Sequence, residues 1–207
     1  MDTKNFDAYE FIAVVIPGSV VALLLIFQWP DLKALIAGNG FSVGGLGLFT
    51  VIAFVLGHLL QGLGSIFESV FWAFRGMPTS WVRNTRQTLV SPAQRDTLVA
   101  KLAAMEGSCI VPEQTRRSHW QSMMSRAYGR VHDAGKSEKI DAFNRTYGLS
   151  RGLTSSFIAA SICIVFLYPS NKSALLLSLS MAILSLWRMY TFGKRYARAL
   201  IQAYIDL

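Results

Sequence analysis

Charged residues are missing from three long stretches of this sequence. Residues 11–30, 34–67 and 152–171 contain no Asp, Glu, Lys or Arg. Each stretch reaches the length of about 20 apolar residues that a helix needs to cross a bilayer. Over the whole chain, charged residues make up 15%, whereas an average soluble domain has roughly 25%. This scarcity of charge argues against a soluble globular protein and predicts a membrane protein.

Cysteines and catalytic motifs are also scarce. Cys109 lies in a polar segment and Cys163 in an apolar run, so we expect no disulfide scaffold. His119 and His132 have no further ligands at metal-binding spacing, and no metal site is expected. There is no G-x-S-x-G, no P-loop and no H-E-x-x-H. We therefore expect no catalytic residues, no cofactor and no enzyme.

The N-terminus lacks the basic region that begins a secretory signal peptide. The first ten residues, MDTKNFDAYE, are net acidic, and no A-x-A site follows the first apolar run. That run is expected to remain as a permanent span. A fourth, shorter apolar run at 173–187 can span if Arg188 snorkels to the headgroups.

These runs predict an all-α polytopic membrane protein with four transmembrane helices in two hairpins. No strand pattern and no repeat at a fixed period is visible. The expected parts are a first hairpin (1–74, with spans at about 11–28 and 45–74), a cytoplasmic helical segment (75–150), a second hairpin (151–190) and an amphipathic tail helix (191–207).

Lys and Arg are distributed unevenly along the chain. Residues 75–151 hold thirteen and residues 188–207 hold four, whereas the two hairpin links hold only Lys33 and Lys172. Cytoplasmic loops retain Lys and Arg, so we expect both termini and the middle segment in the cytoplasm. Lys4 agrees with this orientation. The net charge of +8 is then explained by basic loops beside an anionic leaflet, and a nucleic-acid surface is the less favoured alternative.

Local signals predict helices in the middle segment. Ser91 has the residue type of an N-cap, and Pro92 follows at the first helical position. Further along, helical spacing places one apolar set on a single face. Its members are Trp120, Met123, Met124, Ala127 and Val131.

The second expected span carries a stripe of polar residues. At 100° per residue, the side chains of His58, Gln61, Ser65 and Glu68 fall within an arc of about 80°, and Thr50 falls on the same arc. Polar side chains are costly in hydrocarbon, so this stripe should face other helices or a wet cavity.

Two interpretations of the stripe remain open. In the structural one, Glu68 pairs with Arg151 or Arg188 near the cytoplasmic interface, while His58 and Gln61 hold helices together. In the functional one, the stripe lines a pore or a conduit between subunits.

Small residues and one proline add to this picture. Gly57, Gly62 and Gly64 allow helices to approach closely, which predicts a homo-oligomer. Pro17 interrupts the hydrogen bonds of the first span and is a candidate hinge, with a static bend as the alternative.

The layout resembles that of the small four-helix membrane components of bacterial anti-phage systems, such as the Kiwa membrane subunits. The resemblance lies in the hairpin FIAVVIPGSVVALLLIF…GLFTVIAFVLGHLLQGLG, the basic insert, and the ending WRMYTFGKRYARALIQAYIDL. It implies an oligomeric sensor or effector subunit of a defence or stress system in the bacterial inner membrane, with a cytosolic protein partner and a pore as one outcome. The alternatives are a passive membrane anchor or assembly subunit and, less favoured, a small dimeric transporter.

Overall fold

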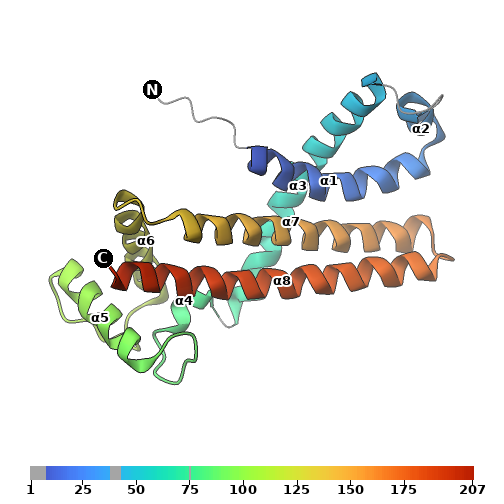
Figure 1. Ribbon diagram of the computed structural model, residues 1–207. Helices are drawn as coiled ribbons and strands as arrows, with labels where there is room; N and C mark the ends of the chain where they lie inside the picture. Colours follow the sequence, from blue (N-terminus) through green and yellow to red (C-terminus); the bar gives the residue numbers. More distant parts are fainter. Residues whose placement is uncertain (1–7, 38–42, 75) are drawn as a thin grey trace. The chain divides into compact units, whose positions relative to one another are not determined.

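A computed structural model describes residues 8–37, 43–74 and 76–207 (Figure 1). The N-terminal residues with Lys4, part of the first hairpin link and Arg75 lie outside the described residues. Within the described ranges the chain is helical and contains no strand, which confirms the all-α class. The helices are α1 (Ala8–Gln28), α2 (Pro30–Ala37), α3 (Val43–Ala73), α4 (Pro78–Trp81), α5 (Pro92–Glu106), α6 (Arg117–Asp133), α7 (Glu138–Leu167) and α8 (Lys172–Ile205).

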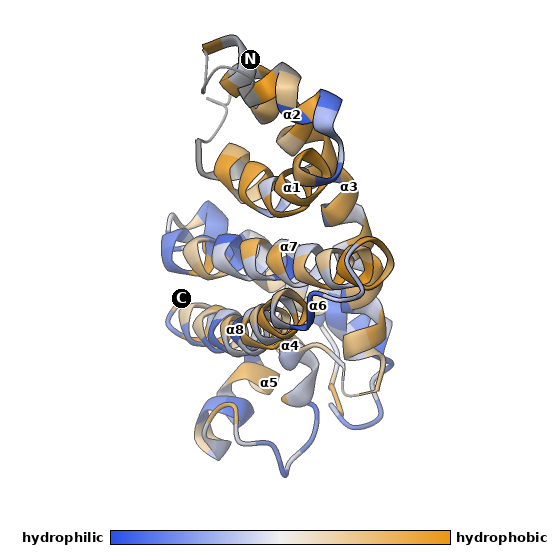
Figure 2. Cartoon of the chain, turned by 90° about the vertical axis from the view of Figure 1, so that its right-hand side faces the viewer, coloured by the Kyte–Doolittle hydropathy of each residue, from blue (hydrophilic) through white to orange (hydrophobic). Residues whose placement is uncertain are grey.

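Four of the described helices, α1, α3, α7 and α8, are long and apolar enough to cross a membrane. The number agrees with the sequence expectation. Each of them keeps large apolar side chains on its surface, and on α3 these recur every three or four residues. The exposed set on α3 includes Val51, Val55, Leu59, Leu63, Ile66 and Val70. In Figure 2 the ribbons of α1 and α3 are mostly orange, as expected for helices with apolar surfaces.

The chain divides into two compact units, which we describe separately. The hairpin unit comprises Met1–Phe71 and Tyr147–Met189, and the helical module comprises Trp72–Thr146 and Tyr190–Leu207. Three helices contribute to both units, because α3 ends in the module, α7 begins there and α8 ends there.

In the hairpin unit, α1 and α3 cross at glycines. A Cβ atom added to Gly18 would lie 1.7 Å from the carbonyl oxygen of Ala53, and one added to Gly57 would lie 2.1 Å from that of Val14. Both clashes are with backbone, which cannot move aside easily. The two helices are therefore closer than any residue larger than glycine permits at these positions.

Hydroxyl groups join α7 to its neighbours in the same unit. Ser155 Oγ donates to Leu60 O of α3 at 2.9 Å, and Ser178 Oγ of α8 donates to Phe157 O of α7 at 3.0 Å. Ser161 Oγ lies 3.0 Å from Ser178 Oγ. Interhelical hydrogen bonds of this kind are typical of helices packed in lipid, where apolar contact alone favours association weakly.

The helical module has a conventional apolar core. The expected face of α6, from Trp120 to Val131, is buried, which confirms that prediction. The α5 cap is also confirmed, because Ser91 and Gln94 form a reciprocal capping box before Pro92. The rest of the core comes from α5, α7, α8 and the loop before α5, and comprises Val82, Leu89, Leu98, Leu102, Ile140, Ala197, Leu200, Ile201 and Tyr204.

The last residues of the chain continue α8 without a break as far as Ile205. Their buried face is centred on Ala197, Leu200 and Tyr204. Leu207, seven residues after Leu200 and so on the same side by helical period, is 47% exposed because it lies beyond the end of α8.

Candidate functional site

The polar stripe of α3 is divided between two environments. Gln61 and Glu68, on one edge of the arc, turn toward α1 and α7 and take part in hydrogen bonds with them. His58 and Ser65, on the other edge, are exposed on the surface of the chain. The stripe that the sequence presents as one feature is therefore two features in the folded chain.

The inward edge forms a network around Glu68. Arg151 Nη1 donates to Glu68 Oε2 at 2.5 Å, and Tyr147 Oη donates to Glu68 Oε1 at 2.6 Å. Arg151 Nη2 also donates to Gln61 Oε1 at 3.2 Å. Both carboxylate oxygens of Glu68 thus accept a hydrogen bond from α7.

The ion pair is largely withdrawn from the surface. The side chain of Glu68 is 14% exposed and that of Arg151 is 24% exposed. Removing one partner would leave the other partly buried and unpaired, which costs more than the loss of an exposed pair. The structure thus places Glu68 against one of its two expected partners. The other, Arg188, is exposed on α8, and the described contacts of Glu68 do not include it.

Gln61 connects this network to the proline of α1. Pro17 has no N–H, so the carbonyl oxygen of Ala13, four residues earlier, loses its helical donor. Gln61 Nε2 supplies a donor instead, at 3.2 Å. Pro17 itself is fully buried, and its Cγ would lie 3.0 Å from a Cβ added to Gly152. The candidate hinge is therefore tightly packed, and its released carbonyl is satisfied by the stripe.

On the outward edge, only some of the polar side chains have hydrogen-bond partners. Ser65 Oγ, on this edge, donates to Gln61 O at 3.1 Å and so bonds within α3. Thr50, which lies at the same angle as Glu68, also bonds within α3, with Oγ1 donating to Leu46 O at 2.9 Å. The His58 ring lies edge-on to Phe54, with centroids 4.5 Å apart. Among the described residues, no hydrogen bond to either ring nitrogen of His58 is found.

The three candidate packing glycines also lie in different environments. Gly57 lies against α1, and a Cβ on Gly64 would lie 3.3 Å from Arg151 Cγ and Ser155 Oγ of α7. Both are buried within the chain. Gly62, by contrast, is exposed, and no atom of the described residues would lie within 4 Å of a Cβ placed on it.

The exposed side of α3 therefore has a line of small and polar residues among its leucines and valines. We call it the His58 face, and it consists of His58, Gly62, Ser65 and Ser69. Ser69 Oγ donates to Ser65 O at 2.9 Å. His58 is the member whose polar atoms are without a partner in the described part of the chain.

No metal centre emerges from the described residues. They contain no group of three or more His, Cys, Asp or Glu side chains that could hold an ion. Cys109 and Cys163 are both free thiols.

One feature of the helical module was missed by the sequence analysis. Arg83, Arg86 and Arg117 line a cavity of about 660 Å³ together with Trp81 and Tyr190. The stretch WVRNTRQT, which combines two arginines with an aromatic residue, carried the only local signal. Arg117 and Tyr190 are distant in the sequence and could not have been assigned to it.

Comparison of the chain with protein-family models, with curated proteins and with solved structures finds no match.

Proposed function

We propose that this chain is an oligomeric membrane subunit whose spans associate through the His58 face. The four apolar helices cross the bacterial inner membrane, and the helical module lies on the cytoplasmic side, where the distribution of Lys and Arg favours it. There it couples a cytosolic protein partner to the membrane, as a sensor or effector subunit of a defence or stress system.

A single observation carries this proposal, namely that the imidazole nitrogens of His58 have no hydrogen-bond partner in the described part of the chain and lie on an apolar surface. Val55 and Val51, one and two turns before it on the same side of α3, are 53% and 60% exposed, so the surroundings are those of a lipid-facing helix. An unsatisfied polar group in hydrocarbon costs several kcal/mol. A second copy of the same face can offer an acceptor or donor and remove that cost.

Gly62 supports the same conclusion by its size. It lies one helical turn after His58, has no side chain, and has open space above it. Close approach of a second helix at this point would bring the two backbones together, as at small-residue interfaces in membranes.

The inward network limits where a conduit could lie. Both oxygens of Glu68 and the amide of Gln61 are engaged within the chain. A pore formed by the oligomer would be lined by the His58 face, and Glu68 would serve to hold α3 and α7 together.

The same engagement favours a second candidate, a passive anchor or assembly subunit. In that case the polar residues serve helix packing alone, and the oligomer conducts nothing. A small dimeric transporter gains no support from any described contact.

The experiment compares the assembly of His58→Leu and Gly62→Leu variants with the wild-type chain in lipid nanodiscs or mild detergent. Both variants should shift the mass measured by light scattering toward the monomer, while their helical circular dichroism stays unchanged. Gly148→Leu on α7 is the matched control, because its position is likewise open but on another helix.

A wild-type protein that is monomeric at all concentrations would contradict the proposal. Ion flux in liposomes then separates the two candidates. An ion flux in the wild type that is lower in His58→Leu supports an effector subunit that forms a pore. A stable wild-type oligomer without ion flux supports a passive anchor.

A further inference from the structure

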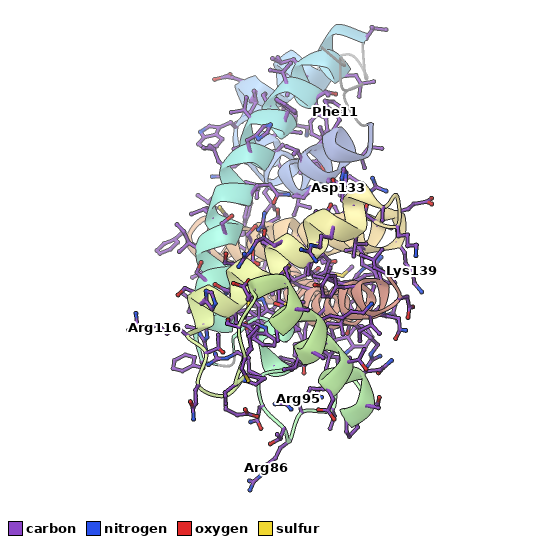
Figure 3. The ribbon with its side chains drawn as sticks, turned by 90° about the vertical axis from the view of Figure 1, so that its left-hand side faces the viewer. Phe11, Arg86, Arg95, Arg116, Asp133 and Lys139 are labelled. Atoms are coloured by element: carbon purple, nitrogen blue, oxygen red, sulfur yellow. The ribbon has the colours of Figure 1, made fainter. Side chains whose placement is uncertain are left out.

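The cavity in the helical module lies between α4, the loop that follows it, and the start of α6. Its volume of about 660 Å³ is within the range of small-molecule sites in proteins. Figure 3 shows Arg86 reaching outward from the loop between α4 and α5. The lining residues are Ser80, Trp81, Arg83, Asn84, Arg86, Gln87, Thr88, Glu113, Arg117 and Tyr190.

The charge of this cavity is positive. Its single carboxylate, Glu113, accepts a hydrogen bond from Arg95 Nη2 at 2.5 Å and is thereby neutralised. Within the part of the chain that the structure describes, no carboxylate pairs with Arg83, Arg86 or Arg117. Three guanidinium groups are therefore left to attract an anion.

Two of these arginines are held in place by the backbone. Arg83 Nε donates to Pro112 O at 3.1 Å, and Arg117 Nη1 donates to Ala73 O at 3.3 Å. Each retains further N–H groups. Gly76 has a φ of 69°, and a Cβ on it would lie 3.2 Å from Arg117 Nη2, so glycine keeps the space in which that guanidinium lies.

An unused hydroxyl gives independent evidence of a ligand. Ser80 is 8% exposed, and its Oγ is buried without a hydrogen-bond partner among the described residues. Unsatisfied buried polar atoms are rare in folded proteins and call for an explanation. Ser80 belongs to the lining of the cavity, and a rotation about its χ1 would bring this hydroxyl to a ligand oxygen there.

The aromatic part of the lining is held by a hydrogen bond and by ring contacts. Trp81 Nε1 donates to Gly76 O at 3.0 Å, and the ring of Tyr190 lies 6.1 Å from that of Trp81 and 5.9 Å from that of Trp72, centroid to centroid. Trp and Tyr are enriched where a protein meets the headgroup layer of a membrane. The cavity is thus lined by guanidinium groups on one part and by the aromatic rings of Trp81 and Tyr190 on another.

We propose that this cavity binds a phosphate group carried by an anionic ligand. Arginine forks match the oxygens of phosphate better than a point charge does, and charge-assisted hydrogen bonds of this kind are strong. The lining extends from the arginines to the rings of Trp81 and Tyr190, which leaves room for a further group on the ligand. An anionic phospholipid headgroup and a soluble phosphorylated metabolite share this chemistry. The proposal stands on the module alone and does not depend on the oligomer.

The test uses the full-length protein in neutral nanodiscs or a zwitterionic detergent. Short-chain phosphatidylglycerol is titrated against short-chain phosphatidylcholine as one arm, and inorganic pyrophosphate is titrated as the other. Binding is measured by calorimetry, and the thermal midpoint is followed by tryptophan fluorescence. Saturation by phosphatidylglycerol alone identifies a lipid site, and saturation by pyrophosphate identifies a soluble ligand.

Arg86→Gln is the informative variant, because the Arg86 side chain makes no hydrogen bond in the described structure and its loss should leave the fold intact. We expect affinity for the binding probe to fall about tenfold, the size of one lost charge-assisted hydrogen bond. Arg86→Lys keeps the positive charge but loses the paired N–H donors of the guanidinium group, so it should retain part of the affinity that Arg86→Gln loses. Arg130→Gln on α6 is the matched control, because it removes an exposed arginine outside the cavity.

Ser80→Ala provides a second variant. Without ligand it should be as stable as the wild type, because the lost hydroxyl had no partner. With the binding probe its affinity should be reduced. Failure of the wild type to bind either probe would overturn the proposal, and so would equal losses in Arg86→Gln and Arg130→Gln.

Discussion

The hairpin unit and the helical module both bury apolar residues, but they differ in the polar residues that they bury and in what covers their surfaces. In the hairpin unit the buried positions include a run of hydroxyl residues on α7, namely Ser150, Thr154, Ser155, Ser156 and Ser161, while leucines and valines cover the outside. In the module, Trp120, Leu98 and Met123 are buried, and most charged residues are exposed.

The contrast follows from the surroundings for which each unit is suited. In water, burial of apolar area favours folding at roughly 25 cal/mol per Å². In lipid that gain is absent between helices, so close backbone contact and interhelical hydrogen bonds take its place. Replacing a tightly packed glycine should therefore lower stability most in the hairpin unit, and replacing a large apolar residue should lower it most in the module.

The largest loss of stability is expected at the contact between α1 and α3, where there is no space for a side chain at Gly18. Gly18→Leu puts a side chain where a Cβ alone would lie 1.7 Å from Ala53 O. Because the obstacle is backbone, α1 and α3 must separate, at a cost of about 3 kcal/mol or more. The thermal midpoint of the purified protein measures this. Gly47→Leu is the control, since its Cβ meets no described atom within 4 Å. Equal midpoints for the two variants would disprove the tight crossing.

Next in size is the loss of a core side chain from the module. Trp120 is fully buried, and its Nε1 donates to Thr79 O at 2.8 Å. Trp120→Ala should destabilise the module by about 3–5 kcal/mol, measured by urea unfolding monitored by near-UV circular dichroism. Leu63 is 54% exposed on α3, and Leu63→Ala should change the free energy of unfolding by no more than about 0.5 kcal/mol. A large loss from Leu63→Ala would show that α3 is covered at that position.

A smaller effect is expected from the ion pair between Glu68 and Arg151 in the hairpin unit. Glu68→Gln keeps the shape of the side chain but leaves Arg151 uncompensated, and we expect a loss of about 1–3 kcal/mol at their partial exposure. Adding Arg151→Gln should restore part of the stability, as measured in a double-mutant cycle of thermal midpoints.

The control for this cycle is Arg188→Gln, because the described contacts of Glu68 are with Tyr147 and Arg151. It should show no coupling to Glu68→Gln. A Glu68→Gln protein that is stable but altered in ion flux would favour the conduit interpretation instead.

The smallest effect concerns a polar contact in the module. Tyr128 Oη donates to Asp141 Oδ1 at 2.7 Å, and this hydrogen bond, with burial, raises the pKa of Tyr128 to about 12. Because the folded state favours the protonated phenol, the contribution is complete below about pH 10 and is lost as the pH rises toward 12.

Tyr128→Phe should therefore be about 1 kcal/mol less stable than the wild type at neutral pH. The difference should narrow above about pH 10 in urea unfolding measured over a pH series. A difference that stays constant to pH 12 would mean that the hydrogen bond does not form in solution.

Much of the fold could be predicted from local pattern. The apolar runs gave the four long helices, the Ser91 and Pro92 signals gave the start of α5, and helical spacing gave the buried face of α6. The expected depth near the cytoplasmic interface left Arg151 and Arg188 as alternative partners of Glu68. Only the packing of α7 against α3 distinguished them, because both arginines lie near the ends of their apolar runs.

The sequence by itself determined the angular position of each residue around its helix, since that depends on the 3.6-residue period alone. It could not determine what lies opposite. Gln61 and Ser65 lie on one arc, yet Gln61 meets the carbonyl that Pro17 releases, 48 positions away, and Ser65 is left on the surface. The cavity of the module likewise brings Ser80, Arg117 and Tyr190 together. Such pairings arise only when helices pack, because they join residues whose separation along the chain carries no periodic signal.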